Sequence, residues 1–460
     1  MNKRKDIQAF IISLEQKYNV NQILYKGISL WPLIRIRLFF FLVFKLENHS
    51  TADGKTESWA IRIWHLLESI GLTLRLLLSP KRITTLYAGS HLHRVMYRGV
   101  SFNRFFDVLM DEAGNENDCL LVEYHNPGKK LNYYKHFRVL QLFKLYPLFF
   151  HLARLRTEEK MEANVLVFIK SMKTEIESAF PIEFNDSKFL AGLQQELKTI
   201  FVYRDIFNVF LKKWRVKETV GLCYYNTPIF GLTIAAAELG IPSVDYQHGP
   251  QNLSYRDWSN VPEEGYTLIP AHFYCWNEID ALAINEWAHR TRRHQAFFHG
   301  NSWVRFWQTG KAEISSGVDW QKNIILYTLQ PVEGCFEPYL LETIKATAGN
   351  FSWWIRLHPR QFHEKDKILR ELSEAGVASF TNIENASELP LPEILMHTKL
   401  HITKFSGSVL EATEFNIPSI IIDQKGKDHF GPFIDERFYR VVLDKNKDSM
   451  LNAIRDLVKN

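Results

Sequence analysis

The stretch KLHITKFSGSVLEATEFNIPSIIID, residues Lys399–Asp423, has the pattern strand, turn, helix, strand. Lys399–Phe405 is apolar and β-prone, and the small residues Ser406–Ser408 form a turn before the helical spacing of Val409–Phe415. Pro418 then opens the next strand. A small-residue turn that enters a helix exposes backbone N–H groups at the positive end of the helix dipole. The stretch therefore predicts a βαβ unit whose turn either binds a phosphate or only caps the helix.

Strands and helices alternate on both sides of this stretch. In the C-terminal part, strands are expected at 323–330, 352–357, 377–382 and 440–444. In the N-terminal part, they are expected at 82–88, 119–124, 219–225 and 242–247. A helical N-terminal segment precedes them at 1–80, and a helical insert separates them at 130–213. This alternation predicts an α/β fold with parallel sheets and right-handed crossovers.

The polar segment Thr309–Lys322 separates the two parts. We therefore expect an N-terminal lobe over 1–310, a C-terminal lobe over 320–445 and a C-terminal helix over 446–460. Ligands of parallel sheets bind at the carboxyl ends of the strands. Two Rossmann-like lobes facing a central cleft would suit a group-transfer enzyme with one lobe for each substrate.

The composition is that of a globular chain with a large buried core, because 46% of the 460 residues are hydrophobic and 23% are charged. The net charge of +5 suits an anionic substrate or an anionic membrane surface without deciding between them. The four cysteines form no CxxC pair, which indicates reduced thiols in a cytosolic protein. The first residues do not have the pattern of a secretory signal.

Two apolar segments carry basic residues, Trp31–Leu46 and Gly71–Arg82. Both are shorter than the roughly 20 residues that a membrane span needs. Either could lie in a membrane interface with its cations toward lipid headgroups. The alternative is that both are buried helices of the first lobe, and the aromatic cluster Phe39–Phe41 favours that alternative.

Polar residues crowd the end of one strand of the first lobe, at Asp245-Tyr246-Gln247-His248-Gly249. Asp245 is a candidate base or nucleophile, and His248 is a candidate base, acid or hydrogen-bond donor to a phosphate. Gln247 is a candidate for nucleotide contact. Glu123 follows another strand of this lobe and is a further candidate acid or base. The alternative is a polar turn with a structural histidine.

In the second lobe, candidate nucleotide-binding residues follow three strands. Arg356 and His358 flank the end of one strand, where arginine forks and a histidine favour an anion. Lys404 precedes the Ser406–Ser408 turn, and Glu411 lies one turn inside the next helix, within reach of a ribose. Gln330, with Glu333 nearby, follows the first strand of this lobe.

Several sequence motifs are absent. There is no GxxxxGK[ST] loop and no GxGxxG after the first strand, so neither a P-loop NTPase nor an NAD-binding site is expected. There is no HExxH motif, so nothing in the sequence requires a metal.

With these motifs in view, the chain resembles bacterial polysaccharide glycosyltransferases of the two-lobed GT-B architecture. The resemblance is carried by Gln247-His248-Gly249, by His358-Pro359, and by the Ser406–Ser408 turn followed by Ile-Pro-Ser-Ile at 417–420. The closest likeness is to the retaining β-Kdo transferases of capsule and lipopolysaccharide O-antigen assembly. It covers most of the chain except the helical insert at 130–213.

This resemblance implies CMP-Kdo as the donor and a glycan or glycolipid as the acceptor. The donor phosphate would lie on Ser406, Gly407 and Ser408, aided by His358 and Arg356, and Glu411 would hold the ribose. Asp245 would attack the anomeric carbon, and displacement by the acceptor would then give net retention. CMP is already a good leaving group, so no metal is demanded. No nucleic-acid partner is expected, and the enzyme would be cytoplasmic, with peripheral contact to the inner membrane left open.

Two other functions remain open. One is an inverting sialyl-type or CDP-glycerol-type transferase on the same fold, in which Asp245 or His248 acts as a base. The other is a noncatalytic scaffold of polysaccharide assembly that kept the fold.

Overall fold

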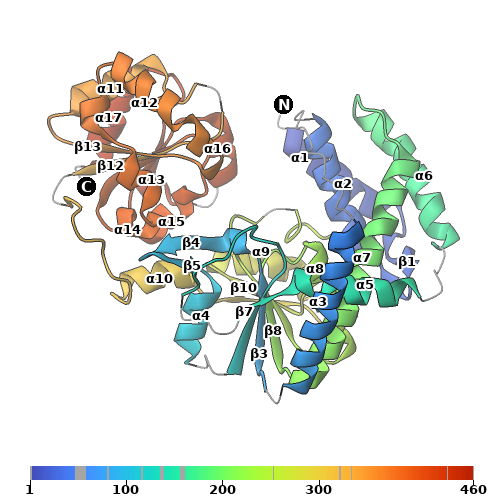
Figure 1. Cartoon of the computed structure of the whole chain (residues 1–460). Coiled ribbons are helices and arrows are strands. Elements are labelled where there is room, and N and C mark those ends of the chain that lie inside the picture. The colour runs from blue at the N-terminus through green and yellow to red at the C-terminus, as the bar shows by residue number, and fades with distance from the viewer. Residues whose placement is uncertain are drawn as a thin grey trace. The chain divides into compact units, whose positions relative to one another are not determined.

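The computed structural model describes residues 3–46, 59–79, 82–114, 118–134, 139–155, 161–251, 253–320, 323–332, 334–431 and 434–458 (Figure 1). The chain divides into two compact units. Unit 1 comprises Met1–Arg94, Phe105–Leu131 and Lys135–Gly300. Unit 2 comprises Val95–Arg104, Asn132–Tyr134 and Asn301–Asn460.

Unit 1 is built on a seven-stranded parallel sheet with the strand order β11-β10-β9-β8-β3-β6-β7. Its strands, in chain order, are β3 (Thr85–Gly89), β6 (Cys119–Glu123), β7 (Val139–Gln141), β8 (Glu218–Gly221), β9 (Ser243–Tyr246), β10 (His272–Cys275) and β11 (Gln295–Phe298). In chain order the sheet begins at its central strand β3 and continues through β6 to β7 at one edge. It then resumes at β8, on the other side of β3, and continues through β9 and β10 to β11 at the other edge. This Rossmann-like order places a topological switch point between β3 and β8.

Helices supply the rest of unit 1. They are α1 (Lys3–Lys17), α2 (Trp31–Leu46), α3 (Trp59–Leu78), α4 (Phe106–Ala113), α5 (Tyr146–Arg154), α6 (Ala163–Ala179), α7 (Asp186–Trp214), α8 (Thr227–Glu238) and α9 (Glu278–Ala288). A short hairpin, β1 (Leu24–Tyr25) and β2 (Ile28–Ser29), precedes α2. The predicted helical N-terminal segment and helical insert are thus confirmed. The insert differs in one respect, because β7 within it extends the sheet.

The long helix α7 packs closely on α8. A Cβ atom on Gly231 of α8 would lie 2.6 Å from the Cβ of Tyr203 and 2.8 Å from the backbone N of Arg204. Only glycine lets the two helix backbones approach this closely. Helix α8 is apolar almost all round because it is enclosed between α7 and the sheet.

The apolar segment Trp31–Leu46 forms α2, and this helix is buried as the aromatic cluster suggested. Arg35 is fully buried in it, and its guanidinium forms an ion pair with Glu15 at 2.8 Å and donates to the carbonyl oxygen of Leu253 at 2.5 Å. A buried arginine is tolerated where its charge is paired and its donors are used. Arg35 therefore belongs to the core of unit 1, whereas Arg37 is partly exposed and Lys45 is exposed.

Unit 2 is built on a six-stranded parallel sheet with the order β14-β13-β12-β15-β16-β17. Its strands are β12 (Ile324–Thr328), β13 (Ser352–Arg356), β14 (Thr381–Asn382), β15 (Thr398–Thr403), β16 (Ser419–Ile421) and β17 (Tyr439–Val441). Its sheet helices are α11 (Pro338–Thr347), α12 (Lys365–Glu374), α13 (Glu384–Glu388), α14 (Leu391–Leu395), α15 (Ser408–Glu414), α16 (Gln424–Phe430) and α17 (Lys447–Val458). Strand order 3-2-1-4-5-6 is that of a Rossmann sheet, with its switch point between β12 and β15.

A hairpin from the N-terminal part of the sequence belongs to unit 2. Its strands are β4 (Arg94–Tyr97) and β5 (Val100–Asn103), joined by Arg98 and Gly99, whose φ angles of 53° and 73° suit a tight hairpin turn. Phe102 of the hairpin stacks on Phe306 of helix α10 (Ser302–Gln308), with ring centroids 5.6 Å apart. The hairpin thus completes its own small core against α10.

Two Rossmann-like α/β units in one chain confirm the predicted GT-B fold class. The compact division falls at Gly300–Asn301 rather than at the polar segment near 310–320, because α10 packs on the hairpin of unit 2. The C-terminal helix α17 packs on α11 and the sheet of unit 2, so it is part of that unit.

Candidate nucleotide-binding and transfer sites

The carboxyl ends of three strands of unit 2 meet at the switch point of its sheet. Thr328 at the end of β12 lies in register with Arg356 of β13 and with Thr403 of β15. Residues that follow these strands therefore lie at one edge of the sheet, where Rossmann-like sheets bind their ligands. The predicted residues that end or follow these strands at this edge are Gln330, Arg356, His358, Lys404, Ser406, Gly407, Ser408 and Glu411. Glu333 lies outside the described residues.

The Ser406–Ser408 turn uses many of its own polar groups. The backbone N–H of Ser406 donates to Thr403 Oγ1 at 3.1 Å, and that of Ser408 donates to Ser406 Oγ at 3.3 Å. The N–H of Leu410 donates to the carbonyl of Gly407 at 3.0 Å. The following helix α15 has only seven residues. These contacts favour the capping interpretation of the turn over a ready-made phosphate seat.

A buried histidine of β15, His401, holds the Ser406–Ser408 turn in place through hydrogen bonds. His401 Nε2 lies 2.9 Å from Thr328 Oγ1 and 3.1 Å from Ser408 Oγ, and its Nδ1 lies 3.0 Å from Ser419 Oγ. Burial lowers the pKa of His401 to about 3, so the ring is neutral. This residue was not predicted from the sequence, although a polar histidine inside an apolar strand could have indicated it.

His358 is held as a hydrogen-bond donor. Its Nδ1 accepts the backbone N–H of Arg360 at 3.2 Å, which leaves the proton on Nε2. Burial, and then the nearby Arg360, lower the pKa of His358. A neutral, half-buried imidazole with Nε2–H available can donate to a phosphate or carboxylate oxygen without the desolvation cost of a full charge.

The charges of two arginines of unit 2 act on Glu411. Burial raises the pKa of its carboxyl group, while the charges of Arg104 and Arg356 act to lower it. Arg104 follows strand β5 of the hairpin, so its place beside α15 could not be read from the sequence. Arg356 donates to the carbonyl oxygens of Ala386 at 2.6 Å and Leu389 at 2.8 Å, and burial lowers its pKa to about 10. These two hydrogen bonds give Arg356 a structural role. Its charge also acts on the carboxyl group of Glu411.

Lys404 is buried, and its ammonium group donates to the carbonyl oxygen of Gly334 at 2.7 Å. Gly426 of α16 packs against the backbone of Lys404, where an added Cβ would lie 2.0 Å from the carbonyl oxygen. Gln330 is also buried, and its amide donates to the carbonyl of Leu329 at 2.9 Å. Both side chains therefore support the loops at this edge of the sheet.

In unit 1, Asp245 is 1% exposed at the end of β9. Its Oδ1 accepts the backbone N–H of Tyr224 at 3.0 Å, and its Oδ2 accepts the hydroxyl of Tyr255 at 2.8 Å. Burial raises the pKa of Asp245 to about 8, although both hydrogen bonds act to lower it. A carboxyl group enclosed in this way is placed to join β9 to two loops, which counts against its predicted role as a nucleophile.

Gln247 and His248 continue the same strand end. The amide of Gln247 donates to Asp280 Oδ2 at 2.7 Å and accepts the backbone N–H of Trp276 at 2.7 Å. This buried amide therefore ties the loop after β9 to the loop after β10. His248 is only half-buried, and its Nε2 lies 3.3 Å from the hydroxyl of Tyr225.

Glu123 is fully buried in an ion pair. Its Oε1 accepts from Arg94 Nε at 2.5 Å, and its Oε2 accepts the amide of Gln141 at 3.0 Å. Arg94 also lies 3.5 Å from a carboxylate oxygen of Asp107. With both oxygens engaged, Glu123 is placed to join β6 to its neighbours rather than to move a proton.

Histidines gather at the carboxyl edge of the unit 1 sheet. Ser90, after β3, lies 2.8 Å from His125 Nδ1, after β6. The rings of His91 and His125 are 6.4 Å apart, as are those of His93 and His248. Partial desolvation, and then the neighbouring His91, lower the pKa of His125. A neutral imidazole at a switch point, such as that of His125, is suited to accept a proton from a hydroxyl group.

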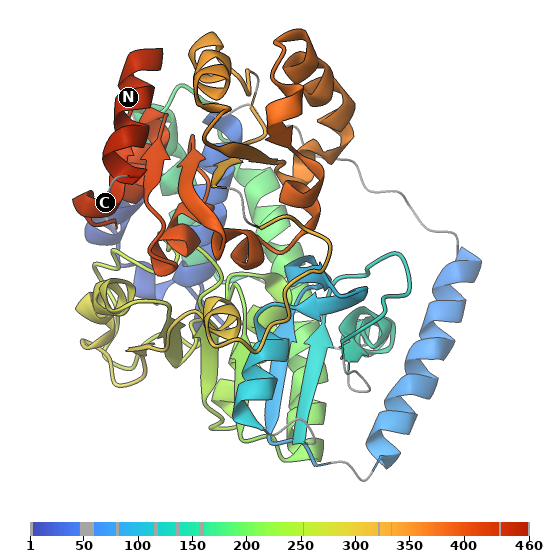
Figure 2. The same cartoon turned by 90° about the vertical axis from the view of Figure 1, so that its left-hand side faces the viewer.

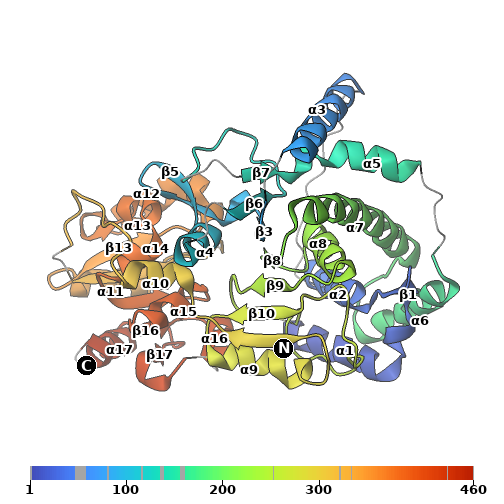
Figure 3. The same cartoon turned by 90° about the horizontal axis from the view of Figure 1, so that it is seen from below.

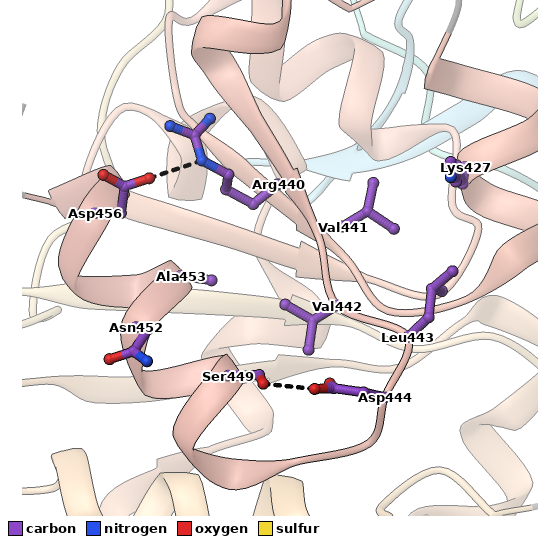
Figure 4. A pocket seen from close by; sticks show the side chains of 10 residues that line it. All are labelled: Lys427, Arg440, Val441, Val442, Leu443, Asp444, Ser449, Asn452, Ala453 and Asp456. Carbon is purple, nitrogen blue, oxygen red and sulfur yellow. Dashed lines mark hydrogen bonds and ion pairs between the residues drawn. The ribbon is translucent and has the colours of Figure 1, made fainter.

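A pocket of about 650 Å³ lies at the outer strand of unit 2 (Figure 4). Its lining residues come from α16, β17 and α17 and the loop between the last two: Lys427, Arg440, Val441, Val442, Leu443, Asp444, Ser449, Asn452, Ala453 and Asp456. Arg440 pairs with Asp456 at 2.7 Å, and Ser449 donates to Asp444 at 2.5 Å, as Figure 4 shows. None of the predicted site residues lines this pocket.

Comparison with known proteins identifies no family. No family model and no curated protein matches the sequence. Among solved structures, the UDP-GlcNAc 2-epimerase from Methanocaldococcus jannaschii is 14% identical, with a TM-score of 0.47 over 82% of this chain and 93% of that chain. A putative UDP-N-acetylglucosamine 2-epimerase from Listeria monocytogenes is 12% identical, with a TM-score of 0.47 over 82% and 88%. The glycotransferase of kitacinnamycin is 9% identical, with a TM-score of 0.41 over 82% and 91%. The assignment of the fold rests on the strand orders themselves.

Proposed function

We propose that this chain is a nucleotide-sugar-dependent glycosyltransferase whose unit 2 binds the donor. The observation that carries the proposal is the edge of the unit 2 sheet, where His358 and Glu411 follow strands next to the switch point of a 3-2-1-4-5-6 sheet and the charge of Arg104 acts on Glu411. A donor histidine and a carboxyl group under the charge of two arginines, at one edge of a sheet, suit a ligand with both an anionic group and hydroxyl groups.

The donor we propose is a CMP-activated acidic sugar, with Kdo as the best candidate, and the acceptor is a glycan or glycolipid. Support comes from the sequence resemblance, and from two cations, Arg104 and Arg356, at the donor edge. In this proposal Nε2–H of His358 binds the phosphate or the sugar carboxylate, and Glu411 binds the ribose hydroxyls.

Two routes of transfer are open to this fold. In the retaining route, Asp245 displaces CMP to form a glycosyl-enzyme, and the acceptor hydroxyl then displaces Asp245. In the direct route, the acceptor oxygen bonds to the anomeric carbon while the bond to the CMP phosphate oxygen breaks, and the hydroxyl proton passes to an imidazole. The enclosed position of Asp245 and the accessible His125 and His248 favour the direct route.

Calorimetry and a donor screen test the proposal. The purified chain is titrated with CMP, CDP and UDP, and then assayed with CMP-Kdo, CMP-sialic acid and CDP-glycerol. We expect CMP to bind best and CMP-Kdo to be consumed. Binding of CDP with consumption of CDP-glycerol would favour the phosphotransferase alternative. Failure to bind any nucleotide would overturn the proposal and favour the scaffold.

The stereochemistry of the product separates the two routes. NMR of the isolated product reports the anomeric configuration relative to the donor. Inversion is expected for the direct route. Retention, together with a sugar adduct on Asp245 in the intact mass, would establish the double displacement instead.

A further inference from the structure

Helix α3 carries apolar side chains on both sides: Leu72, Leu76 and Leu77 pack against the core of unit 1, and others are exposed. Ser69 is fully buried and its Oγ donates to the carbonyl of Leu145 at 2.9 Å, while Thr73 is 5% exposed. The exposed large apolar side chains are Ile63 at 48%, Trp64 at 60%, Leu67 at 62%, Leu74 at 55% and Leu78 at 83%. A helix at the surface of a water-soluble domain usually presents charged and polar side chains on its outer side.

The exposed apolar residues form one continuous stripe. Ile63, Leu67, Leu74 and Leu78 follow each other at intervals of four, seven and four residues, which places them on one side of a helix. Gly71 is exposed between them. Figures 2 and 3 both show α3 at the outside of unit 1, where it contacts α5. A stripe of this kind marks an interaction surface.

The charges around the stripe favour an anionic partner. Arg75 and Arg82 are both exposed, at the C-terminal end of the helix and just beyond it. Among the described side chains of α3, the only acidic one is Glu68, and it pairs with Lys144 at 2.6 Å. Apolar side chains bordered by arginines, with a tryptophan on the same side, are typical of helices that lie in a lipid interface.

We infer that α3 lies on the surface of a bilayer with anionic headgroups, with the stripe in the acyl boundary and Arg75 and Arg82 at the phosphates. No helix of the described residues is long and apolar enough to cross a bilayer, so the contact would be peripheral. This contact does not depend on the transfer reaction. Helix α3 differs here from the buried helix α2, whose apolar residues fill the core of unit 1.

Vesicle flotation tests this inference. The whole chain is mixed with vesicles of equal parts phosphatidylglycerol and phosphatidylcholine, or of phosphatidylcholine alone. We expect binding to the anionic vesicles that weakens as salt is raised. The double substitution Leu67→Ser with Leu74→Ser should lower vesicle binding at least about tenfold. Arg75→Gln should lower it about fivefold on anionic vesicles only.

Helix α9 offers a matched control. It also exposes two apolar residues, Ile279 at 53% and Leu282 at 65%, but begins with the acidic Glu278 and Asp280. Ile279→Ser with Leu282→Ser should float like the unchanged protein. The α3 variants should keep their melting temperature, which shows that the fold is intact.

Three results would overturn the inference. The first is failure of the unchanged protein to float with anionic vesicles. The second is equal flotation of the α3 double variant. The third is a dimer, seen by light scattering, that dissociates on substitution of Leu67 and Leu74 while no vesicle binding occurs, because the stripe would then cover a second copy of the chain.

Discussion

The carboxyl edges of the two Rossmann-like sheets carry similar residue types but use them in different ways. In unit 1, the carboxyl groups of Glu123 and Asp245 are enclosed and have partners on both oxygens. In unit 2, His358 is half-buried and keeps one nitrogen as a donor, and Glu411 lies among cations. A polar residue at a strand end thus serves the fold or a ligand according to how many of its polar atoms the protein already satisfies.

The largest effect is expected for Glu123→Ala in unit 1. The substitution leaves Arg94 buried without its closest counter-charge, which costs about 3–5 kcal/mol. We expect the melting temperature to fall by roughly 5–10 °C in a fluorimetric scan. Glu264→Ala, at an exposed position, is the control and should leave it unchanged. A normal melting temperature with lost transfer activity would instead show a catalytic role for Glu123. The carboxyl groups of unit 1 would then not serve the fold alone.

The second effect concerns Asp245 and pH. Its pKa is about 8 in the folded chain against 3.8 as the ordinary value, so between these values the folded state holds a proton that the unfolded state has lost. The stability that this group contributes is therefore complete at low pH and declines as pH rises toward 8, by about 1.4 kcal/mol for each pH unit within that interval.

Asp245→Asn removes this slope because an amide does not titrate. Melting temperatures from pH 5 to pH 8.5 should fall less steeply in the variant than in the unchanged protein. Transfer activity at pH 7 should stay within about threefold, since the amide oxygen can accept the backbone N–H of Tyr224 while the amide NH2 donates to the hydroxyl oxygen of Tyr255. Loss of all activity with an unchanged pH profile of stability would restore Asp245 as the nucleophile.

The third effect concerns His358 in unit 2. Removal of the Nε2–H donor by His358→Ala should weaken nucleotide binding about tenfold in calorimetry, the worth of one hydrogen bond to a charged group. The melting temperature should change little, because the imidazole is half-buried and bonds only locally. His363 is exposed in the short 3-10 helix Pro359–Glu364 that follows His358, and His363→Ala should bind nucleotide normally. Equal loss in both variants would show that the effect is not specific to the site.

The smallest effect is expected for Glu411→Gln. The amide keeps the shape of the side chain but offers ribose hydroxyls a weaker acceptor, so the KM for the donor should rise about threefold to fivefold while kcat changes little. Glu374→Gln, an exposed change on α12, is the control. An unchanged KM would show that Glu411 does not bind the ribose and serves only as the counter-charge of Arg104 and Arg356.

Local patterns in the sequence predicted the elements around the switch points well. The expected turn at Ser406–Ser408 and the helix after it are present, and so are the strands that carry Arg356 and Asp245. These predictions succeed because strand and helix periods depend on neighbours in the chain.

Contacts between distant segments could not be predicted in the same way. Arg104 reaches Glu411 because the hairpin joins unit 2, and Tyr255 encloses Asp245 from a loop after the strand. Residue types at a strand end do not reveal which neighbours cover them. For the same reason α2 and α3, which look alike in sequence, differ in how much of their apolar surface is exposed.

The hairpin of Val95–Arg104 also has a consequence for synthesis on the ribosome. Its partner helix α10 begins at Ser302, so the nascent hairpin lacks that partner for about 200 further residues, or roughly 10–40 s at ordinary elongation rates. During that interval Phe102 and Tyr97 have no α10 to cover them. A stalled or truncated chain would therefore present an uncovered aromatic hairpin to chaperones and proteases, and unit 2 could not be cut out as a contiguous fragment beginning near residue 301.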